Sequence, residues 1–479
     1  MDQNLMLVTD FYEYTMAYAY FKQGKQNDIA YFDMIIRTIP DGGGYMIFNG
    51  LHALLDFIKH FKFSKEQINY LRSTGYFDED FLSYLSTLTL YIDLYSVPEG
   101  TPVFGNEPLI TVRGSYVQAQ IIESILLQFC NYSTLIATKA SRIVRAAKGR
   151  SVLEFGARRA QGYAAAIEGA RAAMIAGCSG TSNTAAGMLY DLPVSGTIAH
   201  SYIQLFDNEY DAFLQYAKVS PDNCVFLVDT YDTLRSGIPN AIKVAKEYLI
   251  PNGHKLNGIR LDSGDLAYLS KKARSMLDEA GLEDTKIVAS NSLDEFIIAE
   301  LIRQDAAIDI FGVGENLITA KSNPVIGGVY KVVAYEENGE VIPTIKISDN
   351  VAKITNPGYK KLYRFYDRHS KKALADLIAL WDEVIPQDEI EIFDPQAPWK
   401  RKTLKDYEVR ELQVPVLLNG KQVYECPSTQ EVIAYHKEQM ETLWEEVKRQ
   451  VNPHQYYVDL SQALYDLKHQ LLKEHQSKK

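Results

Sequence analysis

The chain is poor in cysteine and contains no long uninterrupted apolar run. Its four cysteines, in 479 residues, are widely separated and form no C-x-x-C pair, which argues against a zinc ribbon or a disulfide framework and fits a reducing compartment. No run approaches the roughly 18 apolar residues that span a bilayer, and the first residues lack the features of a signal peptide. We therefore expect a cytoplasmic protein that has no membrane partner.

Basic residues are also in deficit, with 50 Lys and Arg against 61 Asp and Glu and a formal net charge of −11 at pH 7. This balance argues against a nucleic-acid-binding surface, although local clusters of cations could still hold a small anion. With 46% hydrophobic residues at this length, the chain has the composition of a globular protein with two or three domains.

The most informative pattern is a series of seven or eight short apolar runs over residues 152–332. Most of these runs end in a polar or glycine-rich cluster and precede a helix-like stretch. Residues 265–280, for example, carry apolar side chains at helical spacing behind Asp265, a plausible N-cap. The alternation predicts a parallel β/α sheet closed as an irregular TIM-like barrel, in which chemistry sits at the carboxyl ends of the strands.

The parts of the chain on either side of this region do not alternate in the same way. We expect an N-terminal α+β domain at 1–150, the barrel at 151–332, and a C-terminal region at 333–479 whose strands return to the first domain. The C-terminal region ends in amphipathic helices, the first starting at Ser428, which has capping-box spacing with Glu431. The other elements expected outside the barrel are helices over 9–21 and 118–147 and strands over 29–37, 94–97, 108–112, 332–335, 344–347 and 362–366.

The first two predicted strand ends carry groups that suit an anion. Arg158 and Arg159 offer planar donors to a phosphate or a carboxylate, or form surface ion pairs. Thr181 and Ser182 precede a predicted helix, where their hydroxyls and backbone N–H groups either bind an anion or belong to a helix cap.

His200 follows the third apolar run. An imidazole can act as a base, a ligand or a nucleophile near neutral pH, whereas a lone histidine is more often structural. The position of His200 at a predicted strand end favours the chemical role.

The later strand ends add carboxylates and glycines. Asp229, Asp262 and Asp265 close the fourth and fifth strands, and with Arg260 they suit a magnesium–phosphate or sugar-hydroxyl site, although Asp265 also caps a helix. Gly312 and Gly314 follow the apolar run 308–311 and allow the backbone to approach a phosphate closely.

Eight motifs together resemble nicotinate phosphoribosyltransferase over essentially the whole chain. In chain order they are TDFY (9–12), PEGT (98–101), EFGARRAQG (154–162), GTSNTAAG (180–187), GTIAHSY (196–202), VDTYDT (228–233), IRLDSGD (259–265) and FGVGENL (311–317). The resemblance implies a type II phosphoribosyltransferase fold. It also implies that nicotinate and 5-phosphoribosyl-1-pyrophosphate, with Mg²⁺, give nicotinate mononucleotide and pyrophosphate, coupled to ATP hydrolysis.

The resemblance also implies roles for individual residues. His200 matches the histidine that is phosphorylated from ATP, and Asp229, Arg260 and Asp262 match positions around the ribose and the phosphates. The glycines of the 312–314 loop match the part that holds the 5-phosphate. Mg²⁺ would be held mainly by the substrate phosphates, so no metal ligand is assigned to the protein.

Other matched residues concern the pyridine ring and the assembly. Phe155 would stack on the ring with Arg158 nearby, and Arg158, Arg159 and Arg260 are all eligible to meet the nicotinate carboxylate. Asp10 and Tyr12 match residues that complete the neighbouring subunit's active site, so the resemblance implies a homodimer with shared sites.

Two alternatives remain at this point. Nicotinamide-using relatives carry an acid after Gly-Thr, where this chain has Ser182, so nicotinate is preferred over nicotinamide as the acceptor. A non-catalytic sensor of phosphoribosyl pyrophosphate would be marked by a missing strand-end residue, and His200, Asp229, Arg260, Asp262 and the glycine loop are all present.

Overall fold

A computed structural model describes residues 5–348 and 353–476 and divides the chain into two compact units. Unit 1 combines Met1–Leu135 with Val325–Lys479, and unit 2 is Ile136–Pro324. The chain therefore leaves unit 1 after Leu135 and returns to it at Val325, whereas the sequence analysis placed domain boundaries at 150 and 332.

Unit 2 contains a parallel sheet of six strands in the order β7-β6-β11-β10-β9-β8. The first strand along the chain, β6, pairs with the last, β11, so the sheet closes on itself except between β7 and β8. The barrel predicted from the alternating pattern is thus confirmed, in an irregular form. The strands are β6 Ser151–Glu154, β7 Gly180–Thr181, β8 Val225–Leu227, β9 Gly258–Leu261, β10 Lys286–Ser290 and β11 Ile310–Val313.

An irregular segment runs along β7 at the place where the ring is not closed. Thr181 N–H donates to Pro193 O at 3.0 Å, and Ser195 N–H donates to Thr181 O at 2.9 Å. The backbone then continues without regular structure to Ala199, which is the N-cap of the short helix α9 His200–Ile203.

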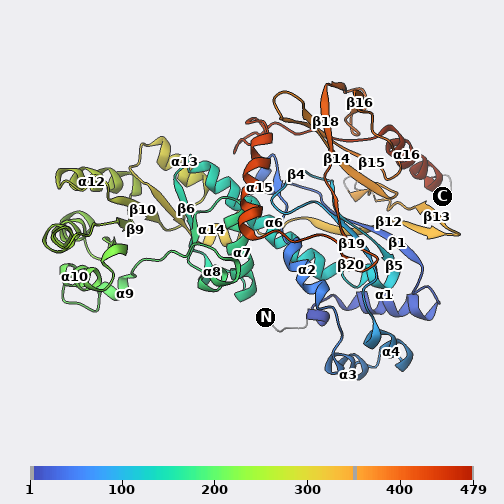
Figure 1. The fold of residues 1–479 in the computed structure, drawn as a ribbon, viewed down its shortest axis with the longest axis horizontal. Helices are drawn as coiled ribbons and strands as arrows, with labels where there is room; N and C mark the ends of the chain where they lie inside the picture. Colours follow the sequence, from blue (N-terminus) through green and yellow to red (C-terminus); the bar gives the residue numbers. More distant parts are fainter. Residues whose placement is uncertain (1–4, 349–352, 477–479) are drawn as a thin grey trace. The chain divides into compact units, whose positions relative to one another are not determined.

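Helices lie around these strands (Figure 1). Their starts are fixed by side chains that accept backbone N–H bonds: Asp265 accepts from Tyr268 N at 3.0 Å, and Asn183, Asn208 and Asp294 cap in the same way. The apolar stripe predicted after Asp265 packs against the barrel core. The helices are α7 Tyr163–Ile175, α8 Thr184–Tyr190, α10 Glu209–Val219, α11 Ile238–Val244, α12 Leu266–Glu279, α13 Glu295–Arg303 and α14 Glu315–Ile318.

Three expectations about strands were wrong: two segments form no strand, and a third forms a strand outside the barrel. Residues 195–199 form no strand, so His200 begins a helix and does not follow a strand. The run after Gly327 forms β12 Gly328–Glu337, which pairs antiparallel with β1 Ile29–Ile36 in unit 1 and not with the barrel. Lys331 within that run has a partly exposed side chain. An antiparallel strand can expose one face in this way, whereas a barrel strand is buried on both faces. Residues 344–347 follow β13 Glu340–Pro343 and are in no strand.

Unit 1 is built on a seven-stranded sheet in the order β13-β12-β1-β5-β3-β19-β20 and a four-stranded sheet in the order β18-β14-β15-β21. Strands from both ends of the chain alternate in the larger sheet, since β12 pairs with β1 and β19 pairs with β3. Further strands are β3 Asp93–Ser96, β5 Pro108–Ser115, β14 Lys360–Asp367, β15 Ala373–Leu380, β18 Tyr407–Glu411, β19 Val414–Leu418, β20 Lys421–Gln422 and β21 Val458–Leu460.

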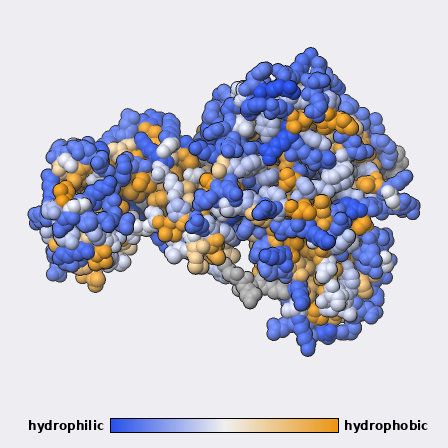
Figure 2. All heavy atoms as spheres, viewed as in Figure 1, coloured by the Kyte–Doolittle hydropathy of each residue, from blue (hydrophilic) through white to orange (hydrophobic). Residues whose placement is uncertain are grey.

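The helices of unit 1 begin with α1 Phe11–Lys22, and the predicted capping box is present at the start of α15 Thr429–Thr442, where Ser428 and Glu431 bond reciprocally. The remaining helices outside the barrel are α2 Leu51–Lys59, α3 Lys65–Ser73, α4 Glu79–Thr87, α5 Tyr116–Gln120, α6 Glu123–Ala146 and α16 Gln462–Gln476. On the face drawn in Figure 2, hydrophilic residues predominate and hydrophobic ones lie in small groups.

The α5–α6 region, Tyr116–Ala146, is long and apolar enough to cross a membrane by length and composition. Two-thirds of its apolar window (67%) is buried inside the protein, as in the core helix of a globular fold. The sequence analysis expected a helix over 118–147, and the structure forms α5 and α6 there.

The core of unit 1 contains a buried charged cluster centred on the neighbouring strands β14 and β15 of the four-stranded sheet. Arg364 donates to both carboxylate oxygens of Asp376 at 2.8 and 2.6 Å, and Tyr456 also donates to Asp376 at 3.0 Å. Glu107 is fully buried beside this pair, and burial together with the Asp376 carboxylate raises the pKa of Glu107 well above its ordinary value. The raised pKa favours the neutral form of Glu107, beside which Arg364 and Asp376 form a balanced pair.

Glu107→Gln tests this arrangement, because glutamine copies the shape of the neutral acid. A carboxyl whose folded-state pKa is raised stabilises the fold at low pH and loses this contribution as pH rises above its unfolded pKa. We therefore expect the free energy of unfolding of the wild type, relative to E107Q, to fall between pH 5 and pH 8 by at most about 1.4 kcal/mol per pH unit. Denaturant titration across this range measures the difference, and a pH-independent difference would contradict a protonated Glu107.

Candidate active site at the mouth of the barrel

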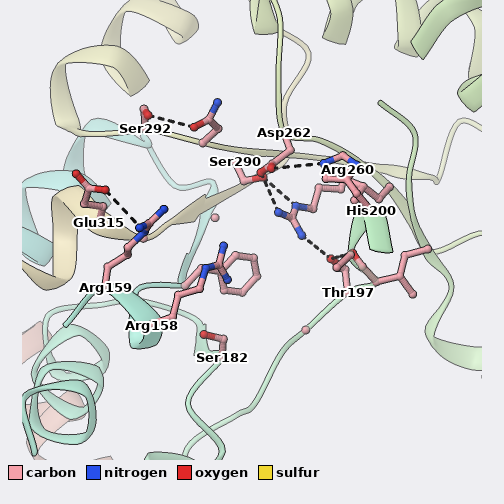
Figure 3. A pocket seen from close by; sticks show the side chains of 18 residues that line it. Arg158, Arg159, Ser182, Thr197, His200, Arg260, Asp262, Ser290, Ser292 and Glu315 are labelled. Carbon is pink, nitrogen blue, oxygen red and sulfur yellow. Dashed lines mark hydrogen bonds and ion pairs between the residues drawn. The ribbon is translucent and has the colours of Figure 1, made fainter. Parts of the chain in front are cut away.

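A cavity of about 480 Å³ lies at the carboxyl ends of the barrel strands (Figure 3). Every strand of the six contributes to its wall, either with its last residues or with the loop that follows. The volume lies in the range of small-molecule sites. The lining residues are Phe155, Arg158, Arg159, Ser182, Gly196, Thr197, Ile198, Ala199, His200, Leu227, Arg260, Asp262, Ser290, Asn291, Ser292, Gly312, Gly314 and Glu315.

Arg260, on β9, is held from three sides. Its Nε donates to Ser290 Oγ at 2.9 Å, its Nη1 to Thr197 Oγ1 at 2.9 Å, and its Nη2 to Asp262 Oδ1 at 2.8 Å. Ser290 Oγ in turn donates to Asp262 Oδ1 (Figure 3). The guanidinium is thus fixed in one orientation, with donor capacity left over for an anion in the cavity.

Asp262 is half-buried in the same network. Burial alone would raise its pKa, but the hydrogen bonds from Ser290 and Arg260 and the positive charge of Arg260 outweigh burial and lower the pKa below its ordinary value. Asp262 is therefore ionised at neutral pH. Its backbone N–H donates to Asp229 Oδ2 at 2.8 Å, so Asp229 holds the loop that follows β9.

His200 faces this network from the N-terminus of α9, with 41% of its side chain exposed. Its Nδ1 lies 3.1 Å from Thr230 Oγ1 and its Nε2 lies 4.0 Å from Asp262 Oδ2. One ring nitrogen is thus engaged by a hydroxyl, while the other points into the cavity beside a carboxylate.

Arg158 and Arg159 lie in a short turn after β6, on the wall opposite Arg260 in Figure 3. Arg159 Nε is 3.8 Å from Glu315 Oε2, and Glu315 bonds more closely to Lys321, at 2.7 Å. The cavity wall thus contains three arginines against two carboxylates, Asp262 and Glu315. This excess of positive charge favours a negatively charged ligand.

Phe155 packs against the glycine loop across the pairing of β6 with β11. A Cβ at Gly312 would lie 2.7 Å from Phe155 Cδ2, and a Cβ at Gly314 would lie 3.1 Å from Phe155 O. Behind Phe155, the buried carboxylate of Glu154 accepts from Gly156 N–H and from Thr181 Oγ1, and burial raises its pKa. Glycine at 312 is thus needed for the ring to occupy its position on the cavity wall.

Backbone donors complete the wall at the end of β10. Asn291 and Ser292 both have left-handed backbone conformations, with φ of 83° and 51°. In the part of the chain that the structure describes, their N–H groups have no acceptor. Two free N–H groups beside Arg260 and the glycine loop can bind an oxyanion.

The structure brings together nine of the fourteen residues predicted for the site: Phe155, Arg158, Arg159, Ser182, His200, Arg260, Asp262, Gly312 and Gly314. The others do not line the cavity. Thr181 donates its hydroxyl to Glu154, Asp229 accepts from the backbone N–H of Asp262, and Asp265 caps α12. Asp10 and Tyr12 belong to unit 1.

The sequence reasoning did not assign Thr197, Ser292 or Glu315 to the site, and it placed Ser290 with Asn291 at a strand end without giving either a role. Thr197 and Glu315 lie inside the quoted motifs GTIAHSY and FGVGENL, so position within a motif was the available signal.

The fold and the cavity together define a β/α-barrel enzyme site that binds phosphorylated or carboxylated small molecules. Three family models match the chain: the nicotinate phosphoribosyltransferase N-terminal domain at 7–131, the nicotinate phosphoribosyltransferase family at 151–376, and the nicotinate phosphoribosyltransferase C-terminal domain at 359–468.

Similar proteins agree with these family models. A nicotinate phosphoribosyltransferase of Bacillus subtilis is 45% identical, covering 100% of this chain and 97% of the relative, and one of Caenorhabditis elegans is 34% identical, covering 97% and 93%. The crystal structure of human nicotinic acid phosphoribosyltransferase superposes with a TM-score of 0.86 at 28% identity, over 97% of this chain and 99% of that one. The chain belongs to the nicotinate phosphoribosyltransferase family, whose enzymes act in pyridine nucleotide biosynthesis.

Gly312→Ala tests the packing of Phe155 against the glycine loop. The added methyl group would displace the ring, and we expect the KM for nicotinate to rise about tenfold, the size of a lost aromatic contact. Steady-state kinetics with nicotinate varied measures the change. Gly327→Ala is the matched control, because a Cβ there meets its nearest neighbour at an ordinary 3.6 Å; equal effects of the two variants would contradict a specific role for the ring.

Proposed function

We propose that the barrel cavity is where this chain carries out the family's reaction, in which nicotinate displaces pyrophosphate from 5-phosphoribosyl-1-pyrophosphate. The observation that carries the proposal is the convergence of three arginines, two free backbone N–H groups and the face of Phe155 on one cavity. Phe155 would stack on the pyridine ring, with Arg158 or Arg159 near its carboxylate. The loop of Gly312 and Gly314 and the 291–292 turn would hold the 5-phosphate.

The substitution needs little acid–base help. The bond between C1 of the ribose and the pyrophosphate oxygen breaks as the pyridine nitrogen attacks, so positive charge develops on the ribose. Asp262, ionised and fixed by Arg260 and Ser290, lies where it can stabilise that charge. Positioning and electrostatics therefore supply most of the rate enhancement.

We also propose that Mg²⁺ is held mainly by the phosphates of the substrate. The described residues contain no cluster of three or more metal-ligating side chains, but Asp229 Oδ1 is buried without a hydrogen-bond partner in the described chain. Asp229 and Asp262 are therefore the side chains that would add oxygen ligands to a phosphate-bound magnesium ion, whose chemistry is to neutralise the leaving pyrophosphate.

ATP coupling through His200 is a further part of the proposal. Thr230 engages Nδ1, so Nε2 is the atom that would attack the terminal phosphorus of ATP, forming an N–P bond as the bond to the ADP oxygen breaks. The resulting phosphohistidine would carry negative charge beside Arg260 and order the site for the pyrophosphate donor.

The proposed assembly is a homodimer in which Asp10 and Tyr12 reach the partner's active site. Tyr12 is 44% exposed at the start of α1. The buried carboxylate of Glu13 accepts from the N–H and hydroxyl of Ser124, which fixes this helix start, and Ser124 Oγ accepts from Asp10 N–H at 3.1 Å. A rigid helix start with an exposed acid and phenol suits a shared site. We also propose that the enzyme is cytoplasmic, as its free cysteines suggest.

His200→Ala tests the coupling. We expect ATP hydrolysis and ATP stimulation to be abolished while slow nicotinate mononucleotide synthesis persists, because the barrel still binds both substrates. Pyrophosphate release with nicotinate or nicotinamide, each with and without ATP, is the measurement. His254→Ala, which removes an imidazole that pairs with Asp222 elsewhere in unit 2, is the control. ATP-stimulated turnover in H200A would contradict coupling through a phosphorylated His200.

Mixing two inactive variants tests the shared site. Asp10→Ala and Arg260→Ala affect different halves of the proposed composite site, so a heterodimer of the two would carry one intact site. We expect up to about half of the wild-type activity per heterodimer, measured after subunit exchange with differently tagged chains. No recovery in confirmed heterodimers would argue against contribution across subunits.

A further inference from the structure

Asn316, the second residue of α14, contacts the loop that follows β10. Its side-chain amide Nδ2 donates to Ser292 O at 3.0 Å and to Leu293 O at 3.1 Å. One amide group therefore binds two consecutive carbonyls of the turn that lines the cavity.

The turn that Asn316 binds is strained. Asn291 and Ser292 are consecutive non-glycine residues with positive φ, and such conformations cost of the order of 1–3 kcal/mol each unless the surroundings hold them. Asparagine tolerates the left-handed region better than most residues, whereas serine does not share that tolerance. Ser292 therefore carries the larger part of the strain.

The strain has a geometric result. The left-handed turn directs the carbonyls of Ser292 and Leu293 toward Asn316. Asn291 and Ser292 remain on the cavity wall, and their N–H groups have no acceptor among residues 5–348 and 353–476. If the turn relaxed to an ordinary conformation, both N–H groups would change direction.

We infer that Asn316 is a positioning residue that holds the 291–292 turn in its left-handed form and so keeps the backbone donors ready for a phosphate group of the phosphoribosyl substrate. Asn316 itself is not among the residues that line the cavity, so it acts through the turn. This inference rests on the proposal that phosphoribosyl pyrophosphate binds in the barrel cavity. We expect Asn316 to affect phosphoribosyl pyrophosphate more than nicotinate, because the nicotinate ring is assigned to Phe155, which follows β6 and not β10.

Asn316→Ala is the first test. We expect the Kd for phosphoribosyl pyrophosphate, measured calorimetrically without nicotinate, to rise roughly tenfold, with the KM for nicotinate changed less than about twofold. Asn316→Gln, which keeps the amide but displaces it by one methylene, should be intermediate. Asn252→Ala is the matched control, since Asn252 also donates its amide to one backbone carbonyl, Tyr248 O, on the exposed side of unit 2.

The decisive variant is the double substitution Ser292→Gly with Asn316→Ala. Glycine adopts positive φ without strain, so the turn should keep its form without the amide, and the Kd should recover at least threefold relative to N316A. The S292G single variant supplies the reference. Should N316A fold poorly, the relieved strain predicts that the double variant folds and binds.

The outcomes separate the inference from the proposal beneath it. An unchanged Kd in N316A, or equal rises for both substrates with no recovery in the double variant, would overturn the positioning role. Arg260→Ala is measured alongside: if it weakens phosphoribosyl pyrophosphate binding while N316A does not, only the inference fails. If R260A leaves that Kd unchanged, the assignment of the substrate to this cavity fails.

Discussion

The pairing of β6 with β11 is the constraint on which the site depends. These strands are the first and last of the barrel, about 160 residues apart in the chain, and their parallel register sets Glu154 opposite Val313. That register places the loop of Phe155, Arg158 and Arg159 against the loop of Gly312 and Gly314. Because Gly312 has no side chain, the ring of Phe155 lies against the backbone of the neighbouring strand, and the two loops form one wall.

Charge on the opposite wall is organised through hydroxyls. Thr197 and Ser290 accept from Arg260, and Ser290 also donates to Asp262, so an arginine and an aspartate two residues apart share a fixed arrangement. The ion pair and the hydrogen bond from Ser290 both favour the ionised form of Asp262. The hydroxyls also spread the donors of the guanidinium over several acceptors, which fixes its orientation.

Much of this was predictable from the sequence because local patterns determine it. The alternation of apolar runs with capped helices indicated the barrel, and the capping roles of Asp265 and Ser428 follow from spacing alone. The positions of Phe155, Arg158 and Asp262 at one mouth follow from their places just after β6 and β9, and Arg260 lies near the end of β9. His200 reaches the same mouth from the start of a helix.

The failures have a common origin in tertiary pairing. The run that begins at Gly328 follows the barrel strands in sequence, yet its partner is β1, about three hundred residues earlier, and no local signal gives that partner. Thr181 and Ser182 are adjacent, yet opposite side-chain directions at a strand end bury the first on Glu154 and expose the second in the cavity. The contacts of Ser290 and Asn316 likewise depend on which strands and loops are neighbours.

The gap between β7 and β8 has a mechanical consequence. Every other junction around the ring is closed by strand-to-strand hydrogen bonds. At this gap the 195–199 segment bonds to β7 through its backbone and to Arg260 on β9 through the side chain of Thr197. No backbone ladder therefore crosses this gap among the described strands, and the segment there leads directly into His200 and the cavity. The barrel wall at this gap depends on side-chain contacts such as the one between Thr197 and Arg260, so a change in those contacts would alter the cavity without breaking a strand pairing.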